Sequence, residues 1–278
     1  MRFVAPPRGQ INPAAFDKPP LSDWSEFDDL LRSPEWPTVD ALNALRRDPS
    51  TPRFVAQTRE LESEQLHYES RIGERSEIAT RENNWHDLLN ALIWLRYPAL
   101  KLALNRRQMK EIAIAGPKDR TRAQCALTHF DEAGILVVVR DRALMRAWDV
   151  HDWFDLFWTR RDAWVYGDAR AIVFGHALLE HALCTGQLLC GKALVVAAHG
   201  GDMDAAMEFV ARRVANGRLL RDPQELRPLP ISGIPGWSAG TNSPSFYATA
   251  ACFQPLRSSR TYPAPADASL DASASDAL

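Results

Sequence analysis

Three polar side chains gather at the start of an otherwise apolar stretch, and their types suit acid–base or hydrogen-bonding chemistry. The stretch from Arg81 to Asn105 reads RENNWHDLLNALIWLRYPALKLALN and carries His86, Asp87 and Asn90 within a few residues. Histidine exchanges protons near neutral pH, and a neighbouring carboxylate can orient it. The pattern therefore indicates a candidate site in the first turns of a helix.

The same helix is predicted to keep a polar and aromatic face along its length. On a helical wheel this face spans an arc of about 100°, with the apolar residues opposite. Its members are His86, Asp87, Asn90, Trp94, Tyr97, Lys101 and Asn105. A solvent-facing stripe normally carries long charged residues, so a stripe with Trp94 and Tyr97 favours a groove wall that contacts a ligand. The alternative is structural: Asn83 or Asn84 caps the helix, Asp87 stabilises its positive end and His86 hydrogen-bonds locally.

A second candidate is the segment FGHALLEHAL, in which His176 and Glu180 are four residues apart. Residues at this spacing meet on one face of a helix. Because a buried glutamate needs a partner, the two can form a buried structural pair or line a pocket as acid–base or metal-binding groups. The spacing differs from the HExxH and HxxEH patterns of zinc peptidases, which excludes that class.

A third candidate is the segment THFDEAG. Two apolar runs flank Asp131 to Gly134, which predicts a hairpin whose tip presents Thr128, His129 and Asp131. Adjacent carboxylates at a turn often serve only the turn, so a structural role stays open here as well.

The pattern of the chain predicts a helix-rich α+β fold, a single domain with a small, mainly antiparallel sheet. We expect an extended N-terminal arm over 1–20, one domain over 21–260, and a disordered Ala/Ser/Asp tail over 261–278. The predicted helices are 22–33 with Ser22 as N-cap, 38–47 with Thr38 as N-cap, 84–106 interrupted near Tyr97 by Pro98, 141–160, 168–186 and 203–216. The predicted strands are 53–58, 66–72 (with a helix over 57–70 as the alternative), the hairpin, 192–198 and an edge strand over 245–253, and 222–244 is expected to be an ordered loop.

Composition narrows the function classes. The formal net charge is −2 and no basic stripe is present, so nucleic acid is not an expected partner. No apolar run is long enough for a membrane span, and the N-terminus has no apolar core of a secretory signal. The four cysteines lack CxxC spacing and are expected to be reduced thiols, so we expect a cytoplasmic protein.

Several of these segments together resemble one family. The segments YESRI, IATRENNWHDLLNALIWLRYPALKLALN, THFDEAGILVVV, FGHALLEHAL and LPISGIPGW resemble the bacterial domain-of-unknown-function family numbered 3025, over about 53–246. The segment ATAACFQPLR departs from the family because no acidic residue stands near Ala248, so we assign no role there. The resemblance implies a shared architecture and a bacterial cytoplasmic origin, and it implies no reaction.

The three polar segments are expected to converge on one site, which requires the side chains of His86 and His176 to lie within about 15 Å of each other. The leading hypothesis is an enzyme that hydrolyses a small polar substrate by acid–base or metal-assisted chemistry, and the residue types are compatible with a divalent metal. The expected catalytic residues are His86, Asp87, His176 and Glu180, and the expected substrate-binding residues are Asn90, Trp94, Tyr97, Thr128 and Asp131. The alternative is a non-catalytic module that binds a metabolite or a protein, with the Trp-rich segment 148–164 as its contact surface.

Overall fold

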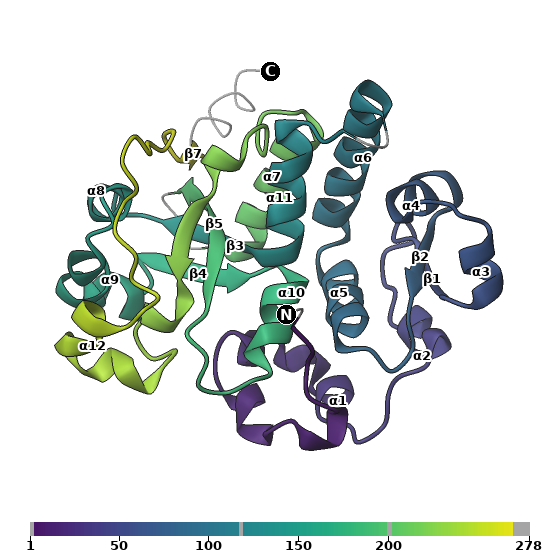
Figure 1. The fold of residues 1–278 in the computed structure, drawn as a ribbon, viewed down its shortest axis with the longest axis horizontal. Helices are drawn as coiled ribbons and strands as arrows, with labels where there is room; N and C mark the ends of the chain where they lie inside the picture. The colour runs from purple at the N-terminus through teal and green to yellow at the C-terminus, as the bar shows by residue number, and fades with distance from the viewer. Residues whose placement is uncertain (1–2, 117–118, 199–201, 269–278) are drawn as a thin grey trace.

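A mixed sheet forms the centre of the molecule (Figure 1). The computed structural model describes residues 3–116, 119–198 and 202–268. Over these residues the strand order is β4-β3-β5-β6, with β7 added beside β5. The strands are β3 (Gly134–Val139), β4 (Ala169–Val173), β5 (Cys190–Ala197), β6 (Arg227–Pro230) and β7 (Ala266–Asp267). β3 runs parallel to β5 and antiparallel to β4, and every residue of β3 is buried, as expected for a continuous apolar strand covered on both faces.

Helices cover both faces of this sheet. Figure 1 shows α8, α9 and α12 on the left of the sheet and α7 and α11 on its right. The bounds are α7 (Arg122–Ala133), α8 (Ala143–Asp149), α9 (Arg161–Val165), α11 (Met203–Ala215) and α12 (Pro244–Thr249). A π-helix (Asp155–Thr159) stands between α8 and α9, and 3-10 helices Pro223–Glu225, Ile231–Gly233 and Ala239–Asn242 order the loop before α12.

A second layer of helices lies beyond α7 and α11 and carries a smaller sheet. α6 (Pro98–Ala115) packs on α11 and α7, and α5 (Trp85–Arg96) packs on α10 (His176–Ala182). The smaller sheet is a parallel pair, β1 (Arg53–Ala56) and β2 (Glu77–Thr80). It lies at the right edge in Figure 1 with α2 (Val39–Ala44), α3 (Arg59–Ser63) and α4 (Tyr68–Arg75).

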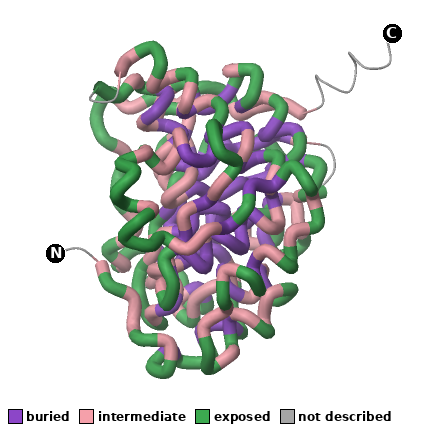
Figure 2. Tube along the Cα trace, turned by 90° about the vertical axis from the view of Figure 1, so that its right-hand side faces the viewer, coloured by how far each residue is buried: buried purple, intermediate pink, exposed green. Residues whose placement is uncertain are grey.

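The N-terminal segment is held against the body by buried side chains. It forms 3-10 helices Arg8–Gln10, Pro13–Asp17 and Leu21–Phe27, followed by α1 (Asp28–Leu31). Ile11, Phe16 and Trp24 are buried. Ser22, the predicted N-cap, lies inside the third of these 3-10 helices. In Figure 2 the buried residues fill the middle of the molecule and the exposed ones lie outside.

The predicted fold class is confirmed, and so are several elements. The chain is helix-rich α+β, although its larger sheet is mixed rather than mainly antiparallel. Strands β1 and β5 and helix α11 form where the sequence predicts them, and Thr38 caps α2 by accepting a hydrogen bond from the Ala41 amide. Pro98 ends the long helix as predicted, because α5 stops at Arg96 and α6 starts at Pro98.

The predicted hairpin after Thr121 is wrong. Residues 122–133 form α7, which runs through Gly134 directly into β3. Thr121 and Gln124 form a reciprocal capping box, which fixes the start of this helix. Gly134 is therefore the C-cap of a helix rather than the glycine of a turn, and Thr128, His129 and Asp131 stand on α7.

Four other elements differ from the prediction. Residues 66–72 belong mostly to α4 rather than to a strand, because Tyr68 and Ile72, read as alternating strand positions, are also one helical turn apart. The predicted helix 168–186 is β4 followed by α10, with Gly175 between them. The predicted helix 141–160 breaks after α8, where His151 takes a positive φ of 57°. The predicted edge strand 245–253 is α12, which starts at Pro244.

The predicted division into arm, domain and tail stays a prediction. Of the predicted tail, residues 269–278 lie outside the described residues, and the part from 261 to 268 includes β7. The four cysteines are free. Every helix of the described residues is too short or too polar to cross a lipid bilayer.

Candidate functional site

A close approach of two backbone segments places α10 against the end of α7. The carbonyl of Gly134 accepts hydrogen bonds from the amides of Phe174 and Gly175 at 2.9 and 2.8 Å. A Cβ at position 175 would lie 2.4 Å from the Gly134 nitrogen and 2.5 Å from the Ala133 Cα, so only glycine fits. This contact brings His176, the first residue of α10, beside the last turn of α7.

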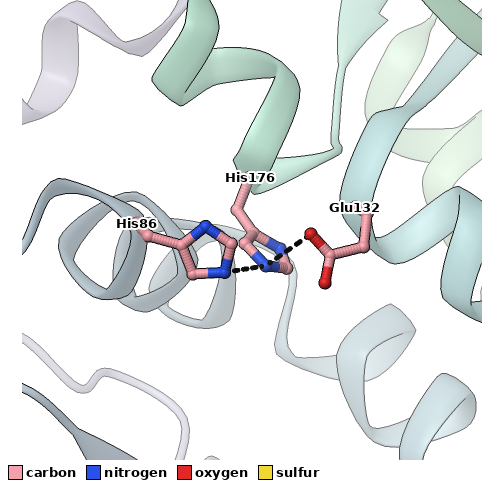
Figure 3. Close-up of side chains that lie close together, drawn as sticks. All are labelled: His86, Glu132 and His176. Atoms are coloured by element: carbon pink, nitrogen blue, oxygen red, sulfur yellow. Dashed lines mark hydrogen bonds and ion pairs between the residues drawn. The ribbon is translucent and has the colours of Figure 1, made fainter. Parts of the chain in front are cut away.

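Three side chains from three helices meet at this contact, as Figure 3 shows. His86 comes from α5, His176 from α10 and Glu132 from α7. The two Nε2 atoms of His86 and His176 lie 3.0 Å apart, and Glu132 Oε2 lies 3.5 Å from His176 Nε2. The two predicted histidines therefore converge, far inside the distance that one site requires, and we call these three residues the His–His–Glu corner.

Two further carboxylates stand behind the histidines. Glu180 Oε2 lies 3.0 Å from Nδ1 of His86, and Asp131 Oδ2 lies 4.0 Å from Nδ1 of His176. The predicted pairing of Glu180 with His176 is thus wrong, because Glu180 reaches across from α10 to α5. Each imidazole presents Nε2 to the corner and turns Nδ1 towards a carboxylate.

The pKa values of the two histidines are shifted in opposite directions. Burial lowers the pKa of His176 to about 3, although Asp131 acts in the other direction. Burial also disfavours the charged form of His86, but the hydrogen bond that its ring donates to Glu180 and the charge of Glu132 outweigh it and raise the pKa of His86. The Nε2 atoms, 3.0 Å apart, form a hydrogen bond when either one carries a proton, and both become available as ligands when a metal ion displaces that proton.

A buried lysine continues the polar network away from the corner. Lys101 Nζ donates to Asp131 Oδ1 at 2.6 Å and to Asn90 Oδ1 at 2.9 Å, and its side chain is only 3% exposed. Asn90 in turn donates to the hydroxyl of Tyr68 at 2.9 Å. Burial disfavours the ionised form of Asp131, but the charge of Lys101 outweighs this and keeps the pKa of Asp131 below its usual range.

Asp87 has a different set of partners. Its Oδ1 accepts from Nη2 of Arg81 at 2.6 Å, its Oδ2 accepts from the backbone amide of Arg81 at 2.6 Å, and its own amide donates to the cap residue Asn84. These contacts fix the chain before α5, and among them only the cap by Asn84 is part of the structural alternative.

The corner opens into a polar cavity of about 250 Å³ between α4, α5, α6, α7 and α10. Asn90, Trp94, Thr128 and Asp131, four of the predicted ligand-binding residues, line it, and Gln108 donates to Thr128 Oγ1 at 3.1 Å. The fifth is placed elsewhere: Tyr97 packs on Trp24 and Phe174. His129 on α7 is exposed.

One family model, described as a protein of unknown function (DUF3025), matches residues 52–257. The chain belongs to the DUF3025 family. No curated protein and no solved structure matches the chain.

The DUF3025 match includes every residue of the corner, and one of them is absent from the sequence-based prediction. In the predicted turn Glu132 is the second of two adjacent carboxylates, a pair that often serves only the turn, so the sequence assigns it no role. The capping box of Thr121 and Gln124 is the signal that identifies α7, and on a helix Thr128, Asp131 and Glu132 share one face. Tyr68, Glu69 and Lys101 also line the cavity without having been assigned a role.

Proposed function

We propose that this chain is an enzyme that hydrolyses a small polar substrate, with the reacting bond at the His–His–Glu corner. The observation that carries the proposal is the convergence of His86, His176 and Glu132, from three separate helices, at one end of a polar cavity. Perturbed titratable groups that meet in a cavity are characteristic of catalytic sites.

The size and lining of the cavity support a small polar substrate. Its volume of about 250 Å³ is slightly below the usual range for ligand pockets, which suits a small substrate. The side chains around it are held by one another, as Asn90 is by Lys101 and Tyr68, so they are oriented before a substrate arrives. Lys101 and the carboxylates provide charged hydrogen-bonding partners for polar substrate groups.

Hydrolysis at this corner follows the usual balance of atoms. The oxygen of water bonds to the electrophilic atom of the substrate while the bond to the leaving group breaks. The proton of the water passes to a carboxylate at the corner and then to the leaving group: to Glu132 in an acid–base route, or to Asp131 if Glu132 instead ligates a metal ion. Burial raises the pKa of Glu132, which brings that carboxylate closer to the range where proton transfer is efficient.

The alternative is a non-catalytic module that binds a metabolite or a protein. The contacts of Asp87 and Asn90 favour it for those two residues, because protein groups already pair with them. The corner itself is not explained in this way. Nδ1 of the buried His176 has no hydrogen-bond partner, which is a cost without a stabilising return in a purely structural network.

The setting proposed for this activity is the bacterial cytoplasm, with a small molecule and not nucleic acid as the ligand. The free cysteines fit a reducing compartment. The near-neutral net charge of −2 supports a ligand other than nucleic acid.

The proposal is tested with a panel of ester, amide and phosphoester substrates and three proteins: wild type, Glu132→Gln and His151→Gln. We expect turnover of at least one class, reduced about 100-fold or more in Glu132→Gln and kept in His151→Gln. Turnover that survives in Glu132→Gln would place the reaction elsewhere. Tight binding of an intact ligand without turnover would support the binding module instead.

A further inference from the structure

We infer that His86, His176 and Glu132 bind a divalent cation of the zinc type. A role for the cation in activating water rests on the proposed hydrolysis. Binding of the cation does not, because it is measured without any substrate.

The distances between the donor atoms fit a metal ion. Zinc lies about 2.0–2.2 Å from imidazole nitrogen and carboxylate oxygen, so two ligands of a tetrahedral centre lie about 3.3–3.6 Å apart. The separations here are 3.0 Å between the two Nε2 atoms and 3.5 Å from His176 Nε2 to Glu132 Oε2. The donor atoms of all three residues lie within 4.8 Å of one another, so rotations of these side chains complete the site.

The groups behind the histidines set them up as ligands. A metal-binding imidazole usually donates its second N–H to a carboxylate or a carbonyl, which fixes the tautomer with the other nitrogen free to ligate. Glu180 holds Nδ1 of His86 in this way at 3.0 Å, and Asp131 lies 4.0 Å from Nδ1 of His176. The contact with Glu180 leaves the Nε2 lone pair of His86 facing the corner, whereas Nδ1 of His176 has no hydrogen-bond partner and Asp131 would have to move closer to orient that ring in the same way.

The charge of the corner also calls for a cation. Glu132, Asp131 and Glu180 face a single ammonium, that of Lys101. When both imidazoles are neutral, as metal ligation requires, these carboxylates outnumber the ammonium, and a divalent cation reduces the excess negative charge. Arg81 is paired with Asp87 and also faces Glu180, so it compensates part of the charge of that carboxylate.

The donor set indicates the kind of cation and its role. Two imidazoles and one carboxylate suit zinc and its transition-metal neighbours, whereas magnesium and calcium favour oxygen-only sets. Three protein ligands leave a fourth position open, as in catalytic rather than structural zinc sites, and the cavity lies beside it. A cation held there would supply Lewis acidity to the reacting bond.

The test is a calorimetric titration of chelator-treated protein with ZnCl₂. The proteins are wild type, Glu132→Gln, His176→Gln and the matched control His129→Gln, whose exposed imidazole stands on the same helix as Glu132. We expect one zinc per chain in wild type and control. In the two ligand variants the affinity should fall by more than the 10–100-fold typical of an outer partner.

Equal affinity in Glu132→Gln and wild type, or no stoichiometric zinc in wild type, overturns the inference. Glu132→Gln keeps the test valid if His176→Gln fails to fold, because the side chain of Glu132 is 45% exposed. The outcomes separate the two proposals. Zinc binding without hydrolysis contradicts the proposed function alone, and hydrolysis that persists in excess chelator contradicts the metal site alone.

Discussion

Two histidine environments in this chain, that of His151 and that of the His–His–Glu corner, differ in the groups that surround the imidazoles. Nδ1 of His151 contacts the carbonyl of Gln254 at 3.2 Å and its Nε2 contacts the hydroxyl of Tyr262 at 2.9 Å, so both nitrogens meet neutral groups. At the His–His–Glu corner the nitrogens meet carboxylates and another imidazole beside a cavity. His151 holds the C-terminal segment against the rest of the molecule through two hydrogen bonds. At the corner, several carboxylates lie close together and are only partly paired with cationic side chains.

The comparison shows which property identifies a site. Burial lowers the pKa of His151 as it lowers the pKa of His176, so the direction of the shift does not separate them. The hydrogen-bond partners separate them. A carbonyl and a hydroxyl satisfy both nitrogens of His151, whereas the imidazoles and carboxylates at the corner form a set of ligands suited to a cation. Four predictions test this difference, from the largest expected effect to the smallest.

Lys101→Met should destabilise the protein by about 3 kcal/mol, because it leaves Asp131 without its buried counter-charge. The measurement is urea unfolding followed by circular dichroism. A change below about 1 kcal/mol would mean that the charge network beside the corner is solvated and that the contrast with His151 is overstated.

Zinc at about 100 times its dissociation constant should stabilise wild type by about 2.7 kcal/mol, because it binds only the folded chain. The same addition should leave the melting temperature of Glu132→Gln unchanged and should shift His151→Gln as much as wild type. An equal shift in Glu132→Gln would show that zinc binds elsewhere.

Glu180→Gln should weaken zinc binding by about 10–100-fold without unfolding the chain, because Glu180 orients His86 and is not itself a ligand. Competition with a fluorescent chelator measures the affinity. A loss as large as in Glu132→Gln would make Glu180 a ligand, and no loss would remove it from the site.

His151→Gln should cost about 1 kcal/mol of stability, the usual value for a lost neutral hydrogen bond, and should leave zinc affinity unchanged. Thermal unfolding and the same competition assay give both values. Weaker zinc binding in this variant would contradict the assignment of a structural role to His151 and of zinc binding to the His–His–Glu corner.

The sequence predicts the position of the site better than the elements that build it. Helix α5 follows from its helical spacing and from Asn84, which caps it through the Asp87 amide. The face of α5 meets both segments that the sequence singled out, the one with His176 and Glu180 and the one from 128 to 134. The types and spacing of site residues are read over a few positions of the sequence. A predicted site can therefore be correct even when the helix or strand that carries it is predicted wrongly.

The failures have physical causes of the same kind. A wheel that continues through Pro98 places Tyr97 on the polar face, but the backbone at Tyr97 leaves the helix with φ −126° and ψ 54° and turns the ring towards Phe174. Glu132 was missed because a glycine after acidic residues fits a turn as well as a helix end. The capping box of Thr121 and Gln124 favours the helix from the sequence alone, whereas the packing of Gly134 against Gly175, which fixes where the helix ends, is not local in the sequence.

The most direct test of the central claim is a crystal of the zinc-treated protein measured on both sides of the zinc absorption edge. The account predicts one anomalous peak per chain, about 2.0–2.2 Å from Nε2 of His86, Nε2 of His176 and a carboxylate oxygen of Glu132. A peak bound by other residues, or no peak at the corner with zinc in excess, would contradict it.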